Sequence, residues 1–207
     1  MHPHPPPGRD ESPRLCDGHD SSFKGRHAPP LGSLGAWRVK DDADPYPASR
    51  GMPPMSVPTD IEGVVIRPLK RFQDARGWLT ELFRDDELPE TFRPVMSYLS
   101  FTHAGVARGP HEHVSQTDGF AFIDGAYRLY LWDNRAGASK DLHTYEVGTD
   151  NPVLVLVPPG VVHAYKNIGE RDAFVLNFPD QLYAGEGKKE PVDEIRHESD
   201  PSSPFQI

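Results

Sequence analysis

Short stretches that alternate apolar and polar side chains, each bounded by turn residues, constrain the fold of this chain most. At 127–132, Tyr-Arg-Leu-Tyr-Leu-Trp alternates with a period of two, which is typical of a strand with one buried face. No segment shows a long helical period. The expected strands are 63–66, 78–83, 96–102, 107–111, 119–122, 126–132, 143–147, 153–157, 162–166 and 173–178. Many short strands between turns predict an all-β sandwich or barrel.

Composition divides the chain into parts. Only 36% of the 207 residues are hydrophobic, and the 23 prolines are concentrated towards the N-terminus. A segment with so little apolar surface cannot offset the entropy cost of ordering. We therefore expect a disordered N-terminal extension at 1–57, a β-barrel domain at 58–184, and a C-terminal tail at 185–207 that packs on the barrel.

Charge and cysteine content narrow the class of protein. The net charge of −9 disfavours a nucleic-acid partner, which would need a basic surface. It leaves room for a phosphorylated small molecule, because a few arginines in one cleft can outweigh the global field. Cys16 is the single cysteine, so no disulfide can form within one chain. The N-terminus lacks the apolar core of a secretory signal and no apolar run could span a membrane, so we expect a cytoplasmic protein.

Two histidine-bearing motifs stand about fifty residues apart. The first combines His-Glu-His at 111–113 with Asp118 and Gly125, and the second is Pro-Pro-Gly-x-x-His-x-x-x-Asn at 158–167. On a strand, His111 and His113 would point to the same side. Asp124-Gly125 is also a typical hairpin turn. Both motifs resemble those of the cupin family, which implies a double-stranded β-helix, or jelly roll.

The cupin resemblance implies a set of metal ligands, namely His111, His113, Asp118 and His163. Three imidazoles and a carboxylate suit a divalent transition metal such as Fe, Mn, Ni, Co or Zn, which the sequence does not rank. The barrel core is expected to hold the aromatic residues Phe101, Phe120, Phe122, Tyr130, Trp132, Phe174 and Phe178.

A second resemblance covers about residues 62–201. The motifs are Phe-x-Asp-x-Arg-Gly-Trp-x-x-Glu at 72–81, Arg-Gly-Pro-His at 108–111, Val-Pro-Pro-Gly-Val-Val-His-Ala-Tyr at 157–165 and Glu-Ile-Arg-His at 194–197. In these motifs the chain resembles the dTDP-4-dehydrorhamnose 3,5-epimerases, which have the cupin fold and use no cofactor. The resemblance implies a nucleotide-sugar substrate and a homodimer.

This second resemblance also implies roles for individual residues. Arg76 and Arg108 would bind the diphosphate, since guanidinium groups pair bidentately with phosphate oxygens. Glu81 would accept hydrogen bonds from the nucleoside. His111 would be the general base that removes a proton from the carbon next to a keto group.

The chain also departs from the epimerase pattern. Glu112-His113 replaces Tyr-Gln, His197 replaces a tryptophan, and Asp118 stands where the family has a lysine that stabilises the enolate. The proton-donating tyrosine of the family falls near Leu176, so Tyr183 is the candidate replacement. The family aspartate that orients the base has no assigned counterpart here.

Three functions remain open on the sequence alone. The first is a nucleotide-sugar 3,5-epimerase or a related isomerase, including a 3,4-ketoisomerase, whose Arg-Gly-x-His-x-His motif is similar to residues 108–113. The second is a metal-binding cupin, such as a small oxygenase or isomerase. The third is a cupin that binds a sugar without catalysis. A metal at His113 and Asp118 could replace the missing lysine as a Lewis acid, which would reconcile the first two.

Overall fold

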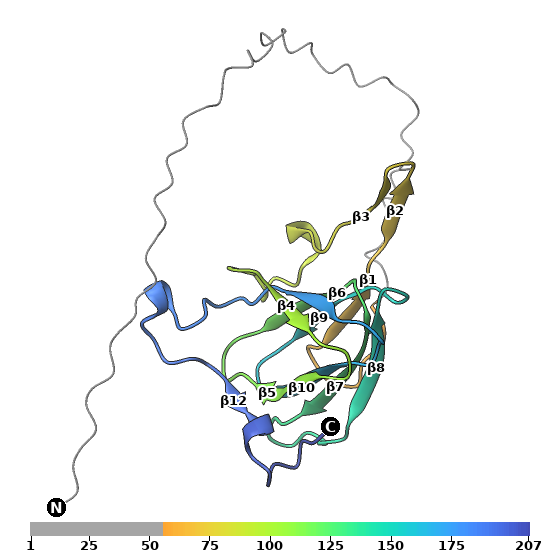
Figure 1. Ribbon diagram of the computed structural model, residues 1–207. Helices are drawn as coiled ribbons and strands as arrows, with labels where there is room; N and C mark the ends of the chain where they lie inside the picture. Colours follow the sequence, from red (N-terminus) through yellow and green to blue (C-terminus); the bar gives the residue numbers. More distant parts are fainter. Residues whose placement is uncertain (1–55) are drawn as a thin grey trace, which may run out of the picture. The chain divides into compact units, whose positions relative to one another are not determined.

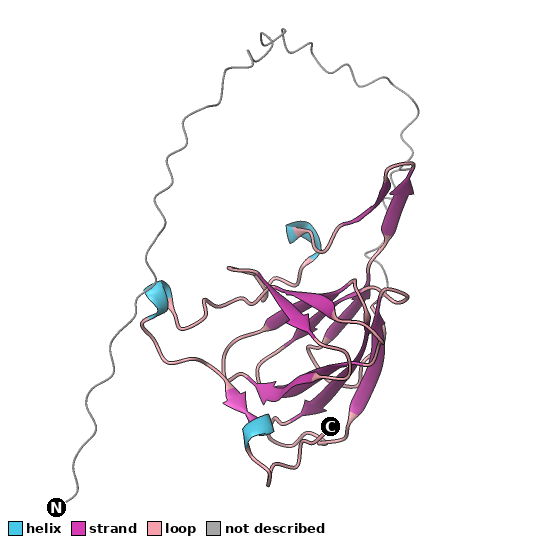
Figure 2. Ribbon diagram, in the orientation of Figure 1, coloured by secondary structure: helices cyan, strands magenta, loops and turns pink. Residues whose placement is uncertain are grey.

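The computed structural model describes residues 56–207, and its regular secondary structure is almost all strand, joined by loops and short 3-10 turns (Figure 2). The all-β prediction is confirmed. Within 56–207, no helix is long and apolar enough to cross a membrane. The predicted disordered extension lies outside the described residues except for its last two. Of these, Val57 forms an isolated antiparallel bridge with Ile66.

Two antiparallel sheets of five strands each form the domain (Figure 1). The first sheet has the order β1 (Val65–Pro68), β9 (Val153–Val157), β6 (Asp118–Phe122), β11 (Ala173–Asn177) and β4 (Tyr98–Thr102). The second has the order β12 (Ile195–Arg196), β5 (Ala107–Glu112), β10 (Val161–Asn167), β7 (Ala126–Asp133) and β8 (His143–Gly148). A separate hairpin pairs β2 (Arg71–Asp74) with β3 (Gly77–Thr80), and the 3-10 turns are η1 (Asp85–Glu87), η2 (Glu186–Lys188) and η3 (His197–Ser199).

The main core lies between the inner faces of the two sheets. Phe120 and Phe122 of β6 are buried against Tyr127 of β7 and Tyr165 of β10, with ring centroids 5.5–5.9 Å apart. β9 is buried along its whole length, which explains its uninterrupted Val-Leu-Val-Leu-Val sequence. The core prediction is confirmed for Phe120 and Phe122. Trp132 and Phe178 are buried in other apolar clusters, and Tyr130 and Phe174 are half-buried. The prediction is wrong for Phe101, which is 54% exposed. Phe101 lies on β4, the last strand of its sheet, where it faces outward.

The hairpin predicted at Asp124-Gly125 is wrong. β6 belongs to the first sheet and β7 to the second, so this turn carries the chain from one sheet to the other. Turn residues indicate that the chain reverses direction, but they do not indicate which strand the next segment pairs with. β2 and β12 were also missed, because their short polar sequences have no apolar alternation.

The C-terminal segment, residues 185–207, contacts the outer face of the second sheet. β12 pairs with β5, with Ile195 opposite Glu112 and Arg196 opposite His111. Phe205 is only 3% exposed and packs against Trp132 of β7, with ring centroids 5.7 Å apart. The segment is therefore attached at two places, by backbone pairing and by an apolar anchor.

Gly125 gives a test of the turn between the sheets. Its φ is +68°, and a Cβ there would overlap the Cβ of Ala173. Gly125→Ala should destabilise the fold by roughly 2–5 kcal/mol, combining left-handed strain with overpacking. Gly137→Ala is the matched control, because its φ is +82° and nothing lies within 4 Å of the added methyl group. The measurement is the urea unfolding midpoint, and equal losses in the two variants would contradict the packing argument.

Candidate functional site

A cavity of about 1130 Å³ is lined by strands of both sheets and by residues from the 179–198 segment. β5 contributes Arg108 and His111, His113 directly follows β5, and the opposite sheet contributes Tyr98 and Asp118. Three basic side chains line the cavity, namely Arg108, Lys188 and Arg196. Seven acidic ones do so as well: Asp118, Asp180, Glu186, Glu190, Asp193, Glu194 and Glu198. The cavity wall is therefore acidic in sum.

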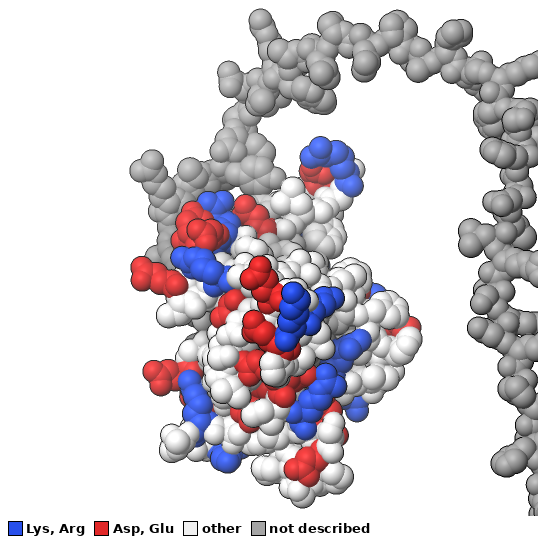
Figure 3. Space-filling view, turned by 90° about the vertical axis from the view of Figure 1, so that its left-hand side faces the viewer, with Lys and Arg blue, Asp and Glu red and all other residues white. Residues whose placement is uncertain are grey.

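The outer surface carries both signs of charge as well. On the face shown in Figure 3, acidic and basic side chains are intermingled and no purely basic stripe is seen. This distribution agrees with the argument from net charge against a nucleic-acid partner.

The histidines at 111 and 113 point into the cavity, and the glutamate between them points away from it. His111 and His113 alternate with Glu112, so the imidazoles enter the cavity while the carboxylate points to the other side of the sheet. His163 of β10 lies directly opposite His111, with ring centroids 4.4 Å apart. Gly109 permits this approach, because a Cβ at its φ of +79° would lie 2.6 Å from the carbonyl oxygen of His163.

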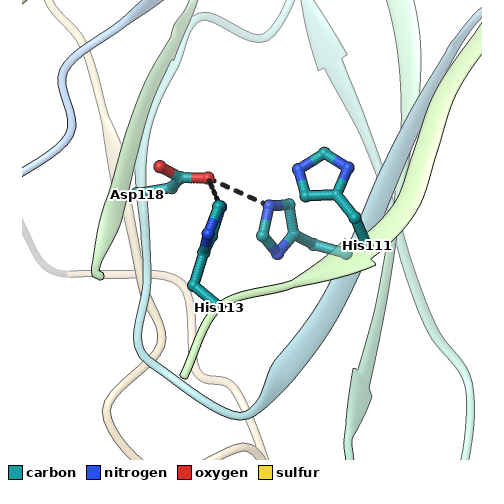
Figure 4. Close-up of side chains that lie close together, drawn as sticks. His111, His113 and Asp118 are labelled. Carbon is teal, nitrogen blue, oxygen red and sulfur yellow. Dashed lines mark hydrogen bonds and ion pairs between the residues drawn. The ribbon is translucent and has the colours of Figure 1, made fainter. Parts of the chain in front are cut away.

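Asp118 joins this cluster from the first sheet. One oxygen of its carboxylate lies 3.0 Å from Nε2 of His113 and 3.1 Å from Nε2 of His163 (dashed lines in Figure 4). The other oxygen accepts a hydrogen bond from the side-chain amide Nε2 of Gln116 at 2.8 Å. Together with His111, these groups offer ligand atoms that all lie within 4.8 Å of one another.

The far nitrogens of two imidazoles indicate their protonation. Nδ1 of His163 lies 3.0 Å from the carbonyl oxygen of Val161, and Nδ1 of His113 contacts the carbonyl oxygen of Asp193. A carbonyl only accepts, so each Nδ1 carries the hydrogen. Each Nε2 then points its lone pair at the Asp118 carboxylate unless a further cation lies between them. The cluster therefore requires protons on Nε2 or a metal ion.

The electrostatics separate His111 from His113. Burial lowers the pKa of His111 to about 2, and the neighbouring His163 acts in the same direction. Burial also opposes the charged form of His113, but its hydrogen bonds to Asp118 and Asp193 raise its pKa to about 9. Burial likewise opposes ionisation of Asp118, yet its bonds to His113 and His163 hold its pKa far below the usual range. At neutral pH, His111 is neutral beside a His113–Asp118 ion pair.

Residues 72–189 match the family described as Polysaccharide biosynthesis C-terminal domain. The chain belongs to this family. It is 33% identical over 127 residues to the probable low-salt glycan biosynthesis epimerase Agl13 of Haloferax volcanii, covering 60% of this chain and 81% of the relative. It is 36% identical over 126 residues to the spore coat polysaccharide biosynthesis protein SpsL of Bacillus subtilis, covering 59% and 82%.

Solved structures agree with the predicted fold. A dTDP sugar isomerase from Desulfovibrio desulfuricans G20 has a TM-score of 0.61 and 24% identity, covering 70% of this chain and 91% of its own. The dTDP-4-dehydrorhamnose 3,5-epimerase from Elizabethkingia anophelis NUHP1 has a TM-score of 0.58 and 20% identity, covering 70% and 80%. The predicted epimerase-like jelly roll is thereby confirmed as the fold of this family member.

The structure brings most of the predicted site residues together. The four predicted metal ligands form the cluster described above, and Arg108 and Tyr183 line the same cavity. Arg76 and Glu81 do not line it. Arg76 lies in the β2–β3 turn, 88% exposed and paired with Asp74, while Glu81 follows β3 and lies 3.6 Å from Arg84.

Sequence reasoning missed three residues that face the cluster. Gln116 binds Asp118, and Asp193 and Glu194 approach from the C-terminal segment. Tyr98 lines the wall opposite β5. The Asp193 carboxylate accepts hydrogen bonds from the backbone N–H groups of 114–116 at 2.8–2.9 Å. Glu194 Oε1 lies 4.0 Å from Nδ1 of His111. The signal for these two acids was the motif at 194–197, which Glu194 begins and Asp193 immediately precedes.

Proposed function

We propose that this protein is an enzyme that epimerises a keto sugar carried on a nucleotide. It would remove a proton from the carbon next to the keto group and return one from the other side. The observation that carries this proposal is a neutral His111 on one wall of a large cavity, with a tyrosine on the facing wall. Membership of a polysaccharide biosynthesis family and the name of the Haloferax relative support the same activity.

His111 is the proposed base, and Glu194 supplies what it lacks. An imidazole with a pKa of about 2 is a weak base, because a catalytic base works best with a pKa near the working pH. If Glu194 moves from 4.0 Å to hydrogen-bond distance of Nδ1, its carboxylate stabilises the imidazolium and raises that pKa. Glu194 would thus fill the role of the acid that the sequence did not locate.

Two tyrosines are candidates for the proton donor. Tyr183, predicted from the sequence, lines the cavity from the C-terminal side and is 55% exposed. Tyr98 lines it from β4, in the sheet opposite His111. Burial and the Asp118 carboxylate raise the pKa of Tyr98 above its usual value, which keeps its phenol protonated. We favour Tyr98, because a base and an acid on opposite walls can reach opposite faces of a sugar ring.

The base assignment is tested with dTDP-4-keto-6-deoxyglucose in deuterium oxide. His111→Asn should slow solvent-deuterium exchange into the sugar by roughly 10²–10⁴-fold, the usual contribution of a general base. His103→Asn is the matched control, because His103 is exposed and does not line the cavity. Wild-type exchange rates in His111→Asn would refute the assignment, while no exchange in the wild type would refute the proposed substrate.

A metal-assisted reaction is the second candidate. It is favoured because the Nε2 lone pairs of His113 and His163 and the Asp118 carboxylate all face one another. His111, His113, Asp118 and His163 would hold a divalent transition metal, and the Nδ1 hydrogen bonds of His113 and His163 suit ligands that coordinate through Nε2. Such an ion would supply Lewis-acid polarisation of a sugar oxygen, the role of the missing lysine. His111 would then be a ligand, and Tyr98 and Tyr183 would be left to move protons.

Elemental analysis separates the two candidates. Protein produced with Fe, Mn, Ni and Zn supplied should carry about one metal ion per chain if the second candidate holds. His113→Ala should lose that ion, and a chelator should lower the melting temperature of the wild type only. Metal-free wild-type protein that still exchanges deuterium would leave His111 as the base.

We further propose a homodimer in which the β2–β3 hairpin completes the cavity of the other copy. The hairpin exposes Trp78 and Leu79, and edge strand β4 exposes Leu99 and Phe101. These four large side chains are suited to burial in an interface. The acidic cavity also needs further cations to hold a diphosphate, and Arg76 of a second copy would supply one, with Glu81 for the nucleoside.

Mixing two inactive variants tests the shared site. Arg76→Ala and His111→Asn, each inactive alone, should regain up to about a quarter of wild-type turnover per chain when mixed and refolded together. One cavity of each mixed dimer then has both native residues. Mixing His111→Asn with Arg108→Ala is the control, because both residues line the cavity of one chain and no recovery is expected. The absence of recovery in an Arg76→Ala and His111→Asn mixture that forms dimers would overturn the proposal.

A further inference from the structure

Three residues of the C-terminal segment lie against residues 111–113, at the end of β5. The carbonyl oxygen of Asp193 accepts from His113, the Glu194 carboxylate faces His111 at 4.0 Å, and His197 lies against Glu112. The contacts to His111 and His113 are made inside the cavity. The contact to Glu112 is made on the other side of the strand, away from the cavity.

The Glu112–His197 pair is buried, and each member has a second hydrogen-bond partner. Oε1 of Glu112 lies 3.0 Å from Nε2 of His197 and accepts from Nδ2 of Asn134 at 2.8 Å. Nδ1 of His197 lies 3.1 Å from Oγ of Ser203. Their side chains are 7% and 14% exposed, so removal of one partner would leave the other buried with one hydrogen bond fewer.

Both members of the pair stand where the epimerase pattern has other residues. Glu112 replaces a tyrosine and His197 a tryptophan. The two departures meet in one contact. A polar pair has therefore taken the place of two aromatic residues at the joint between β5 and the C-terminal segment.

β12 has only two residues, so its backbone pairing is a weak attachment for the groups it carries. Asp193 fixes its start by binding the 114–116 turn, and the Glu112–His197 pair fixes its end. Glu194 lies between these two points. Its distance from His111 thus depends on both attachments.

We propose that Glu112 and His197 are positioning residues, which act through β12 to hold Glu194 and Asp193 against His111 and His113. The effect on turnover rests on the proposed function. The effect on the imidazoles does not, because it can be measured without a substrate.

The test records imidazole nitrogen shifts of the full chain by long-range ¹H–¹⁵N NMR. Glu112→Ala and His197→Ala should shift the resonances of His111 and His113, assigned with His111→Asn and His113→Gln. In the deuterium-exchange assay they should lower kcat by about 10- to 100-fold with a smaller change in KM, as expected for misplaced groups. Glu112→Gln should restore both properties, because its amide oxygen can still accept from His197.

Leu88→Ala is the control. Leu88 belongs to another buried apolar cluster and does not line the cavity, so its loss should lower the unfolding midpoint while leaving both imidazoles unchanged. If Glu112→Ala does not fold, His197→Gln takes its place and should shift the imidazole resonances. Native imidazole shifts in folded Glu112→Ala or His197→Gln would overturn the inference. Shifted imidazoles together with a wild type that turns over no sugar would refute the proposed function alone.

Discussion

The pairing of β12 with β5 is the contact on which the geometry of the cavity depends. His111 and His113 lie at the end of β5, and Glu194 directly precedes β12 and approaches His111. The two sheets and their core form without β12, since the buried Val, Leu and Phe side chains between them belong to other strands. The core therefore determines the fold, while a two-residue strand determines the surroundings of His111.

The cluster around Asp118 adds a second constraint, which is electrostatic. Both imidazoles that face its carboxylate use their other nitrogen to bind a backbone carbonyl. Nδ1 of each ring therefore carries a hydrogen. A positive charge is then needed where the two Nε2 atoms face the Asp118 carboxylate. A proton and a metal ion meet this requirement equally, so one arrangement of side chains is compatible with both types of chemistry. The neutral His111 at its edge differs from His113, because burial opposes its charged form and the Glu194 carboxylate lies 4.0 Å away, beyond hydrogen-bond distance.

Local sequence patterns predicted the parts of this structure that local physics determines. Strand alternation gave the all-β class, and the i, i+2 spacing of His111 and His113 placed both in one cavity. The two cupin-like motifs also predicted that His163 and Asp118 lie beside these histidines, as they do. The turn at Gly125 shows where such patterns fail, because the choice of sheet for β7 depends on contacts distant in sequence.

Long-range pairing accounts for the residues that were missed. Nothing in the sequence around Glu194 indicates that it lies beside a histidine more than eighty residues earlier, since β12 has no apolar alternation. Arg76 and Glu81 show the reverse case. A motif match gave them a role, but in a single chain the hairpin that carries them does not reach the cavity lining.

The late position of Asp193 and Glu194 has a consequence for how damage to this protein would be observed. A chain that stops at Pro191 keeps every strand of the first sheet and four of the second, and so retains the main core. It loses the carbonyl that orients His113 and the acid beside His111. Truncated copies could thus accumulate as folded barrels with a disorganised cavity, and abundance in a cell extract would be a poor guide to function.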